Sequence, residues 1–212
     1  RIIVAMLKRL GVEDVICFSY GKKGNREAEI SRQVAEALGY RWYFVEYTKE
    51  KLYDSYHSGE MQKYLKYGGN LVSLPHIQDF LAVKELKEAG KIPENAVIVP
   101  GHQGMVAGGL MHKGILAGNP VHHNRPEKYT VETLQKEISR YYYSLWDWVE
   151  TSELSTIFNK KIQMSIGDVG IGGVEEYANI IELFEFKERK SKFIINSVRV
   201  YDTFTYGWRL PL

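Results

Sequence analysis

Two short loops combine glycine with residues that can contact phosphate or move a proton. The first loop, residues 19–24, reads SYGKKG, and the second, residues 100–104, reads PGHQG. Glycine lets the backbone approach a ligand closely, and lysine offers positive charge to a phosphate. His102 could donate a hydrogen bond to a phosphate or shuttle a proton, and a hydrogen-bonded structural histidine in a turn is the alternative. The pattern alone leaves both a ligand role and a plain turn open for each loop.

Each loop follows a short apolar run that predicts a β-strand. Continuous apolar runs bounded by turn residues are typical of strands covered on both faces, whereas apolar residues at helical spacing predict helices. The predicted strands are 15–19, 42–47 and 96–100, and the predicted helices between them are 25–38 and 75–89. Strands that alternate with helices run parallel, so we expect an open α/β sheet with these three strands as neighbours. Ligands bind beyond the carboxyl ends of such strands, which would bring both loops to one edge.

The first ten residues and the second half of the chain are predicted to be helical. Residues 1–10 carry apolar side chains over so much of their surface that we expect a buried helix. Apolar spacing predicts further helices, and no further strand, at about 130–148, 151–158 and 174–195. The charged run KERKSK, residues 187–192, is expected on a solvated helix face.

These elements predict how the chain is organised. We expect residues 1–118 to form an α/β nucleotide-binding core and residues 119–212 to form a helical region packed on it. At this length the chain can bury most of its apolar surface without disulfides or a structural metal.

Composition argues against several classes of protein. The 28 lysines and arginines against 26 aspartates and glutamates give a formal net charge of +2, far from the concentrated basic balance of a nucleic-acid binder. No run approaches the roughly 20 apolar residues of a membrane span. The one cysteine, Cys17, lies in an apolar run and is expected to be a small buried hydrophobe, which fits a reducing compartment. We therefore expect a cytoplasmic protein with no nucleic acid and no membrane as partner.

Other residues that sometimes carry chemistry favour structural interpretations here. His122 and His123 are adjacent, and neighbouring side chains rarely converge on one ion; the sequence predicts no metal site built by the chain. Tyr141, Tyr142 and Tyr143 point in different directions on a helix, so we expect packing rather than a stacking platform.

Long runs of the chain resemble a known enzyme family. The similarity covers the runs RIIVAMLKRLG, VICFSYGKKGNREAEISRQVAEALGY and WYFVEYT, and it continues in LVSLPHIQDF, IVPGHQG and SKFIINSVRVYDTFTYGWRLPL. These runs look like the synthase domain of asparagine synthetase and its shorter relatives, members of the PP-loop ATP pyrophosphatase superfamily. The resemblance implies an adenine nucleotide alpha-hydrolase-like fold, in which helices flank an open parallel sheet and the C-terminal part is helical.

The resemblance also implies roles for particular residues. The positions that match the family's nucleotide contacts are Phe18, Ser19, Tyr20, Gly21, Gly101, Gln103 and Gly104. The matching catalytic candidates are His102, in the family's third signature, and Arg209, in its terminal pattern, as a cation facing the cleft.

Two departures from the family pattern bear on activity. The family's S-G-G-x-D-S loop, which holds pyrophosphate and helps to hold magnesium, would stand just before Arg1, so we expect the chain to be a fragment. The third signature lacks its acidic pair, because Gly104 is followed directly by Met105. We therefore expect residues 1–212 alone not to exchange pyrophosphate into ATP.

The activity implied by the resemblance is that of an AMP-forming amide ligase that uses ATP and Mg²⁺. A small-molecule carboxylate acceptor would attack the α-phosphate, release pyrophosphate and form an acyl adenylate, and ammonia would then give an amide and AMP. Such chemistry depends on positioning and on neutralising the leaving group. Ammonia would come from solution, a missing segment or a separate glutaminase. The alternative is a nucleotide-binding module without catalysis; an enzyme acting on transfer RNA is disfavoured by the near-neutral charge.

Overall fold

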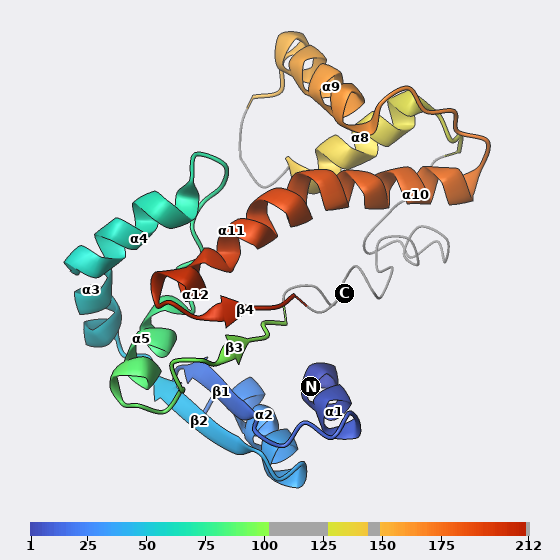
Figure 1. Cartoon of the computed structure of the whole chain (residues 1–212). Helices are drawn as coiled ribbons and strands as arrows, with labels where there is room; N and C mark the ends of the chain where they lie inside the picture. Colours follow the sequence, from blue (N-terminus) through green and yellow to red (C-terminus); the bar gives the residue numbers. More distant parts are fainter. Residues whose placement is uncertain (102–126, 144–148, 211–212) are drawn as a thin grey trace. The chain divides into compact units, whose positions relative to one another are not determined.

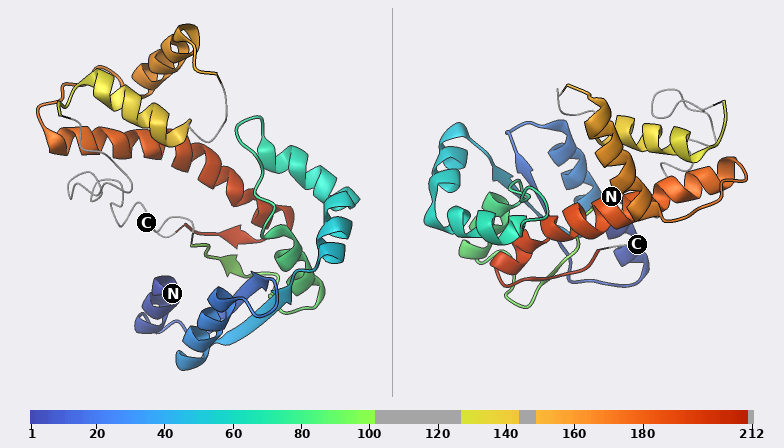
Figure 2. Two further views of the ribbon diagram at one scale, coloured as in Figure 1. Left: turned by 180° about the vertical axis from the view of Figure 1, so that it is seen from behind. Right: turned by 90° about the horizontal axis from the view of Figure 1, so that it is seen from above.

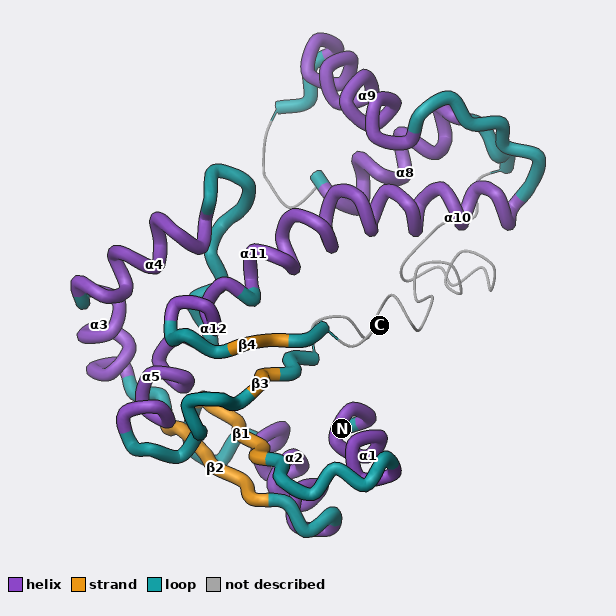
Figure 3. Tube along the Cα trace, in the orientation of Figure 1, coloured by secondary structure: helices purple, strands orange, loops and turns teal. Residues whose placement is uncertain are grey.

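The computed structural model describes residues 1–101, 127–143 and 149–210 (Figure 1). Over these ranges the chain is a mixed α/β protein in which helices predominate and the parallel sheets are small (Figure 3). No helix in the described ranges is long and apolar enough to cross a membrane.

The chain divides into two compact units. The described residues 1–101 and 195–210 belong to the first unit, and those between 127 and 194 belong to the second. The predicted boundary at residue 118 lies outside the described residues. The division differs from the predicted one at the C-terminus, where residues 195–210 belong with the α/β unit rather than with the helical region.

The first unit contains the strand–helix–strand motif that the sequence predicts. Strand β1 (Ile16–Gly21) pairs in parallel with β2 (Arg41–Glu46) over six residue pairs, and α2 (Arg26–Ala37) connects them. Helix α2 begins where Asn25 accepts a hydrogen bond from the Ala28 amide, 2.7 Å away. This capping bond satisfies one of the donors that a helix start leaves unpaired.

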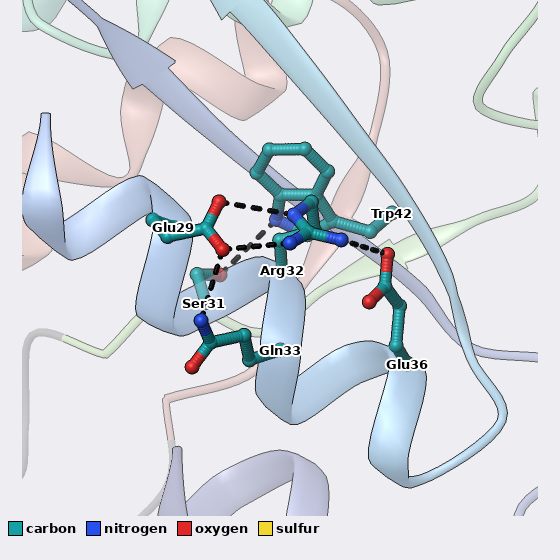
Figure 4. Close-up of polar contacts among 6 residues, drawn as sticks. All are labelled: Glu29, Ser31, Arg32, Gln33, Glu36 and Trp42. Carbon is teal, nitrogen blue, oxygen red and sulfur yellow. Dashed lines mark hydrogen bonds and ion pairs between the residues drawn. The ribbon is translucent and has the colours of Figure 1, made fainter. Parts of the chain in front are cut away.

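Helix α2 has a polar outer face, and one of its serines is hydrogen-bonded to β2. On the outer face, the guanidinium of Arg32 lies between the carboxylates of Glu29 and Glu36, at 2.6 and 2.5 Å (Figure 4). Exposed pairs of this kind contribute only a few tenths of a kcal/mol each. Trp42 of β2 donates its indole N–H to the Ser31 hydroxyl at 3.2 Å, which connects the strand to the helix (Figure 4).

The third predicted strand has a different partner from the one expected. Strand β3 (Val97–Ile98) pairs in parallel with β4 (Gly207–Trp208), so the described residues contain two separate two-stranded sheets. The prediction of three neighbouring strands in one sheet is therefore wrong for the third strand. The prediction of no further strand is also wrong, because β4 is only two residues long and carries no apolar run that would have revealed it.

Two predictions of burial are also corrected. None of the six residues of β1 is fully buried, since β2 is its only paired neighbour among the described residues. Helix α1 (Ile2–Arg9) forms as predicted, but none of its residues is buried, and Ile2 is 80% exposed. Ile3, Val4 and Leu7 are partly buried, and Lys8 lies over the ring of Tyr40, 5.1 Å from its centroid.

Three helices lie between the two sheets in sequence. They are α3 (Lys49–His57), α4 (Gly59–Gly69) and α5 (Phe80–Glu88). The sequence places the start of α5 at residue 75, five residues too early. The hydroxyls of Tyr64 and Tyr47 donate to the carbonyls of His76 and Gln78, both at 2.5 Å, and hold this segment as a loop.

The C-terminal segment completes the core of the first unit. Helix α11 (Ile195–Ser197) and α12 (Arg199–Thr203) lie beside α4 (Figures 1 and 2). Asn196 donates its side-chain amide to the Gly69 carbonyl at 3.0 Å. The buried core residues are Val45, Met61, Tyr64, Phe80, Ala82, Val83, Leu86, Ile92, Ile98, Val198, Val200, Tyr201 and Tyr206.

The second unit is helical in its described residues, as predicted. Its helices are α8 (Val131–Tyr142), α9 (Ser152–Ile166), α10 (Val174–Phe184) and the π-helix η1 (Glu185–Ile194). The three consecutive tyrosines at 141–143 pack against its core, which confirms that interpretation. Lys190, expected on a solvated face, is 2% exposed and lies 3.7 Å from the carboxylate of Glu185.

Candidate functional site

The carboxyl end of β1 carries the first group of predicted nucleotide contacts. Ser19, Tyr20 and Gly21 are the last residues of the strand and pair with Phe44, Val45 and Glu46 of β2. Phe18 packs against the core of the first unit, and its side chain is partly buried there. The structure therefore places these neighbouring candidates together in the second half of one strand.

Gly21 has a backbone conformation that other residues rarely adopt. Its φ of +129° lies in the region that favours glycine, and a Cβ atom would lie 3.2 Å from the side-chain nitrogen of Asn25. The side chain of Asn25 therefore lies where a Gly21 side chain would be, and the Gly21 carbonyl accepts from the Tyr47 amide at 2.8 Å. A larger residue at Gly21 would strain the fold as well as block a ligand, so replacing it cannot test binding by itself.

Asn25 shapes the loop between β1 and α2. Its side-chain nitrogen donates to the Lys22 carbonyl at 3.2 Å, while its oxygen caps α2. The side chains of Lys22 and Lys23 are exposed. Arg1, just before α1, forms an ion pair at 2.7 Å with Glu27 in the first turn of α2, so the amino ends of these two helices lie close together.

The side chain of Tyr20 is held by a buried carboxylate. Its hydroxyl donates a short hydrogen bond to Oδ1 of Asp79, and its ring stacks on Tyr47 with centroids 5.0 Å apart. The hydroxyl of Tyr201, on α12, donates to Oδ2 of the same carboxylate, and His76 Nε2 lies 3.3 Å from Oδ1. The hydroxyl of Tyr20 is therefore occupied, whereas its backbone stays at the strand end.

These hydrogen bonds determine the charge state of the cluster. Burial opposes the charge on Asp79, but hydrogen bonds from His76, Tyr20 and Tyr201 outweigh that penalty and hold the pKa of this carboxyl below its usual value. Burial and the neighbouring Asp79 charge together raise the pKa of both Tyr20 and Tyr201. Asp79 is therefore an anion, and the two tyrosines remain neutral donors, at neutral pH.

The second group of candidates lies at the end of the other sheet. Arg209 directly follows β4, and its amide donates to the carbonyl of Ile98, in β3, at 2.9 Å. Gly101, three residues beyond Ile98, is exposed. The parallel pairing of β3 and β4 therefore brings the predicted cation beside the strand that leads to Gly101. The guanidinium of Arg209 donates to the Trp208 carbonyl at 2.8 Å.

The remaining candidates lie outside the described residues. These are His102, Gln103 and Gly104, and the adjacent His122 and His123 lie outside them as well. The prediction that residues 19–21, 101 and 102 line one cleft stays a prediction. In the described ranges, no three or more histidine, cysteine, aspartate or glutamate side chains gather in a way that could hold a metal ion.

Comparisons with protein-family models, with curated proteins and with solved structures find no match to this chain.

Sequence reasoning missed the cluster around Asp79. Its donors Tyr20 and Tyr201 lie 59 and 122 residues away in the chain, so no local spacing joins them to Asp79. The one available signal was an acidic residue directly before the apolar helix start at Phe80, and this pattern is usually attributed to helix capping. In the structure Asp79 makes no side-chain capping bond, because both of its oxygens accept from tyrosines.

Proposed function

We propose that this chain is the nucleotide-binding part of an ATP-dependent, AMP-forming amide ligase of the asparagine synthetase type. The proposal combines the family resemblance of the sequence with one structural observation, the β1–α2–β2 motif. Strand β1 of this motif ends at Gly21, and a short loop then leads to α2, which Asn25 caps. In open parallel sheets, ligands bind beyond the carboxyl ends of the strands, and Gly21 lies at that end of β1.

Several positive groups around this strand end would suit an anionic ligand, beside the carboxylates of Glu27 and Glu29 in the first turn of α2. The amino ends of α1 and α2 lie close together through the ion pair of Arg1 with Glu27, and each helix start carries a partial positive charge. Lys22 and Lys23 add full positive charges on the exposed loop between β1 and α2. Phosphate groups of ATP would complement this field, with Mg²⁺ accompanying the nucleotide.

Arg209 would provide a further cation. Its place beside β3 suits a group that neutralises charge as pyrophosphate leaves, and fixed cations of this kind act mainly by electrostatic stabilisation. A small-molecule carboxylate and ammonia would be the other reactants. The proposed chemistry needs positioned loops and charges rather than a catalytic triad.

A calorimetric titration with ATP tests the proposed nucleotide site. The variant Lys22→Glu/Lys23→Glu reverses two exposed charges and is expected to weaken ATP binding by at least about tenfold, because contacts to charged groups contribute about 1.5–3 kcal/mol. The control variant Lys63→Glu/Lys66→Glu makes the same charge change on exposed residues of α4 and should bind ATP like the unmodified chain. Equal effects of the two variants, or no binding of ATP by the unmodified chain, would refute the site.

A second candidate is a nucleotide-binding module without catalysis. It is favoured by the absence of an acidic residue between Gly101 and the paired glycines Gly108 and Gly109. Because residues 1–212 alone are expected not to exchange pyrophosphate into ATP, the two candidates are separated by joining a segment that carries an S-G-G-x-D-S loop before Arg1 and measuring exchange with and without a panel of carboxylates. Carboxylate-dependent exchange in that longer chain supports the ligase, whereas ATP binding without any exchange supports the binding module.

A further inference from the structure

A single buried carboxylate connects the two groups of candidate residues in the first unit. Asp79 is 6% exposed, and it lies in the turn that precedes α5. One of its oxygens accepts from Tyr20 and the other from Tyr201. These two tyrosines are on β1 and α12, so Asp79 joins three segments that are distant in sequence.

Each tyrosine lies on a segment of the chain that also carries a predicted functional residue. Tyr20 directly precedes Gly21, which is part of the proposed nucleotide site. Tyr201 lies on α12, which is followed by β4 and then by Arg209. Along this segment the Tyr206 amide donates to the Tyr201 carbonyl at 3.0 Å, and the indole of Trp208, next to Arg209, donates to the Asp202 carboxylate on α12 at 2.9 Å.

The cost of burying a charge keeps both tyrosine hydroxyls bonded to the Asp79 carboxylate. A buried carboxylate is tolerated only when hydrogen bonds replace the water that it has lost. Moving Tyr201 away would remove the tyrosine donor of Oδ2, and moving Tyr20 away would leave Oδ1 with His76 alone of its two described side-chain partners, so both hydroxyls are held in place. The stacking of Tyr47 on the Tyr20 ring restricts the ring further.

We propose that Asp79 is a positioning residue that couples the nucleotide-contacting end of β1 to the segment that carries Arg209. The coupling to ATP rests on the proposed function, whereas the coupling between the two segments does not. Tyr20 contributes to the site through its backbone, because its hydroxyl is bonded to Asp79. A change at α12 is thereby transmitted to β1, and a change at β1 is transmitted to α12.

Amide chemical shifts in the nucleotide-free chain test the coupling directly. Tyr201→Phe removes one hydroxyl on α12 and is expected to shift the amide signal of Gly21, and Tyr20→Phe is expected to shift that of Arg209. In an Asp79→Asn background, Tyr201→Phe should cause no further shift at Gly21. The control Tyr177→Phe removes a hydroxyl that donates to the Thr133 carbonyl at 3.1 Å in the second unit, and it should leave the Gly21 amide signal unchanged.

Binding measurements then test the functional consequence. Tyr201→Phe is expected to weaken ATP binding by about fivefold or more, the lower end of typical coupling between sites, while Tyr177→Phe binds like the unmodified chain. An unmoved Gly21 amide in Tyr201→Phe overturns the inference. If the unmodified chain does not bind ATP, the proposed function fails, and the amide shifts still decide whether Asp79 couples the two segments.

Discussion

At the scale of residues, the first unit depends on a carboxylate that water hardly reaches. Asp79 is bonded by two tyrosine hydroxyls and lies beside His76, and its pKa is held below the usual value. A group whose pKa is lowered by folding stabilises the folded state when it is charged. That contribution is complete above the pKa of the unfolded chain, about 3.9, and is lost as pH falls through the lower pKa of the folded state.

Asp79→Asn is therefore expected to lower the free energy of unfolding by about 2–4 kcal/mol at pH 7, because it removes the charge that the tyrosines bond. The difference between the two proteins should shrink as pH falls below about 4, because Asp79 becomes protonated first in the unfolded chain and then, at lower pH, in the folded one. Urea unfolding at several pH values measures both effects. Asp54→Asn, on the exposed surface of α3, is the control and should change stability by less than about 0.5 kcal/mol. A pH-independent difference for Asp79→Asn would contradict this account.

At the scale of elements, helix α2 connects local folding to the candidate site. Asn25 caps the helix with its oxygen and holds the Lys22 carbonyl with its nitrogen, so one side chain serves both the helix and the loop that precedes it. Thr48 caps α3 in a similar way, by accepting from the Lys51 amide at 3.2 Å, but it does not lie in that loop. The two caps therefore form a matched pair.

Asn25→Ala and Thr48→Ala should each destabilise the chain by about 1 kcal/mol, the usual effect of losing a helix cap. Only Asn25→Ala is expected to weaken ATP binding as well, because only this variant also releases the loop that contains Lys22. Thermal unfolding and calorimetric titration of the two variants provide the comparison. The role of the loop would be refuted if both variants bound ATP equally well.

At the scale of the whole molecule, the first unit is built from both ends of its sequence. Residues 195–210 return to the unit that residues 1–101 begin, and they provide the buried side chains of Val198, Val200, Tyr201 and Tyr206. Burying one such side chain contributes about 1.5–3 kcal/mol, and a whole domain is stable by only about 5–15 kcal/mol. The C-terminal segment therefore accounts for a large part of the stability of this unit.

A chain that ends at residue 194 is accordingly expected to lose the cooperative unfolding of its first unit. Near-ultraviolet circular dichroism and protection of the amides in β1 and β2 would report this loss. Adding residues 195–212 as a separate peptide should restore part of the protection, because the same side chains can return to the core. Undiminished protection in the shortened chain would show that the segment is dispensable.

Local signals in the sequence determined the parts of the fold that depend on neighbouring residues. The cap at Asn25 and the turn at Gly39, with φ +74°, mark the ends of α2, and the apolar runs on either side become β1 and β2. Tertiary contacts decided the rest. Strand β3 pairs with a two-residue strand about 110 positions later, and the hydroxyls of Tyr47, just after β2, and Tyr64, on α4, hold the residues before α5 as a loop. The hydrogen bonds of Asp79 to Tyr20 and Tyr201 could not be predicted for the same reason. Hydrogen bonds and burial act through space, and spacing along the chain does not encode which distant groups will meet.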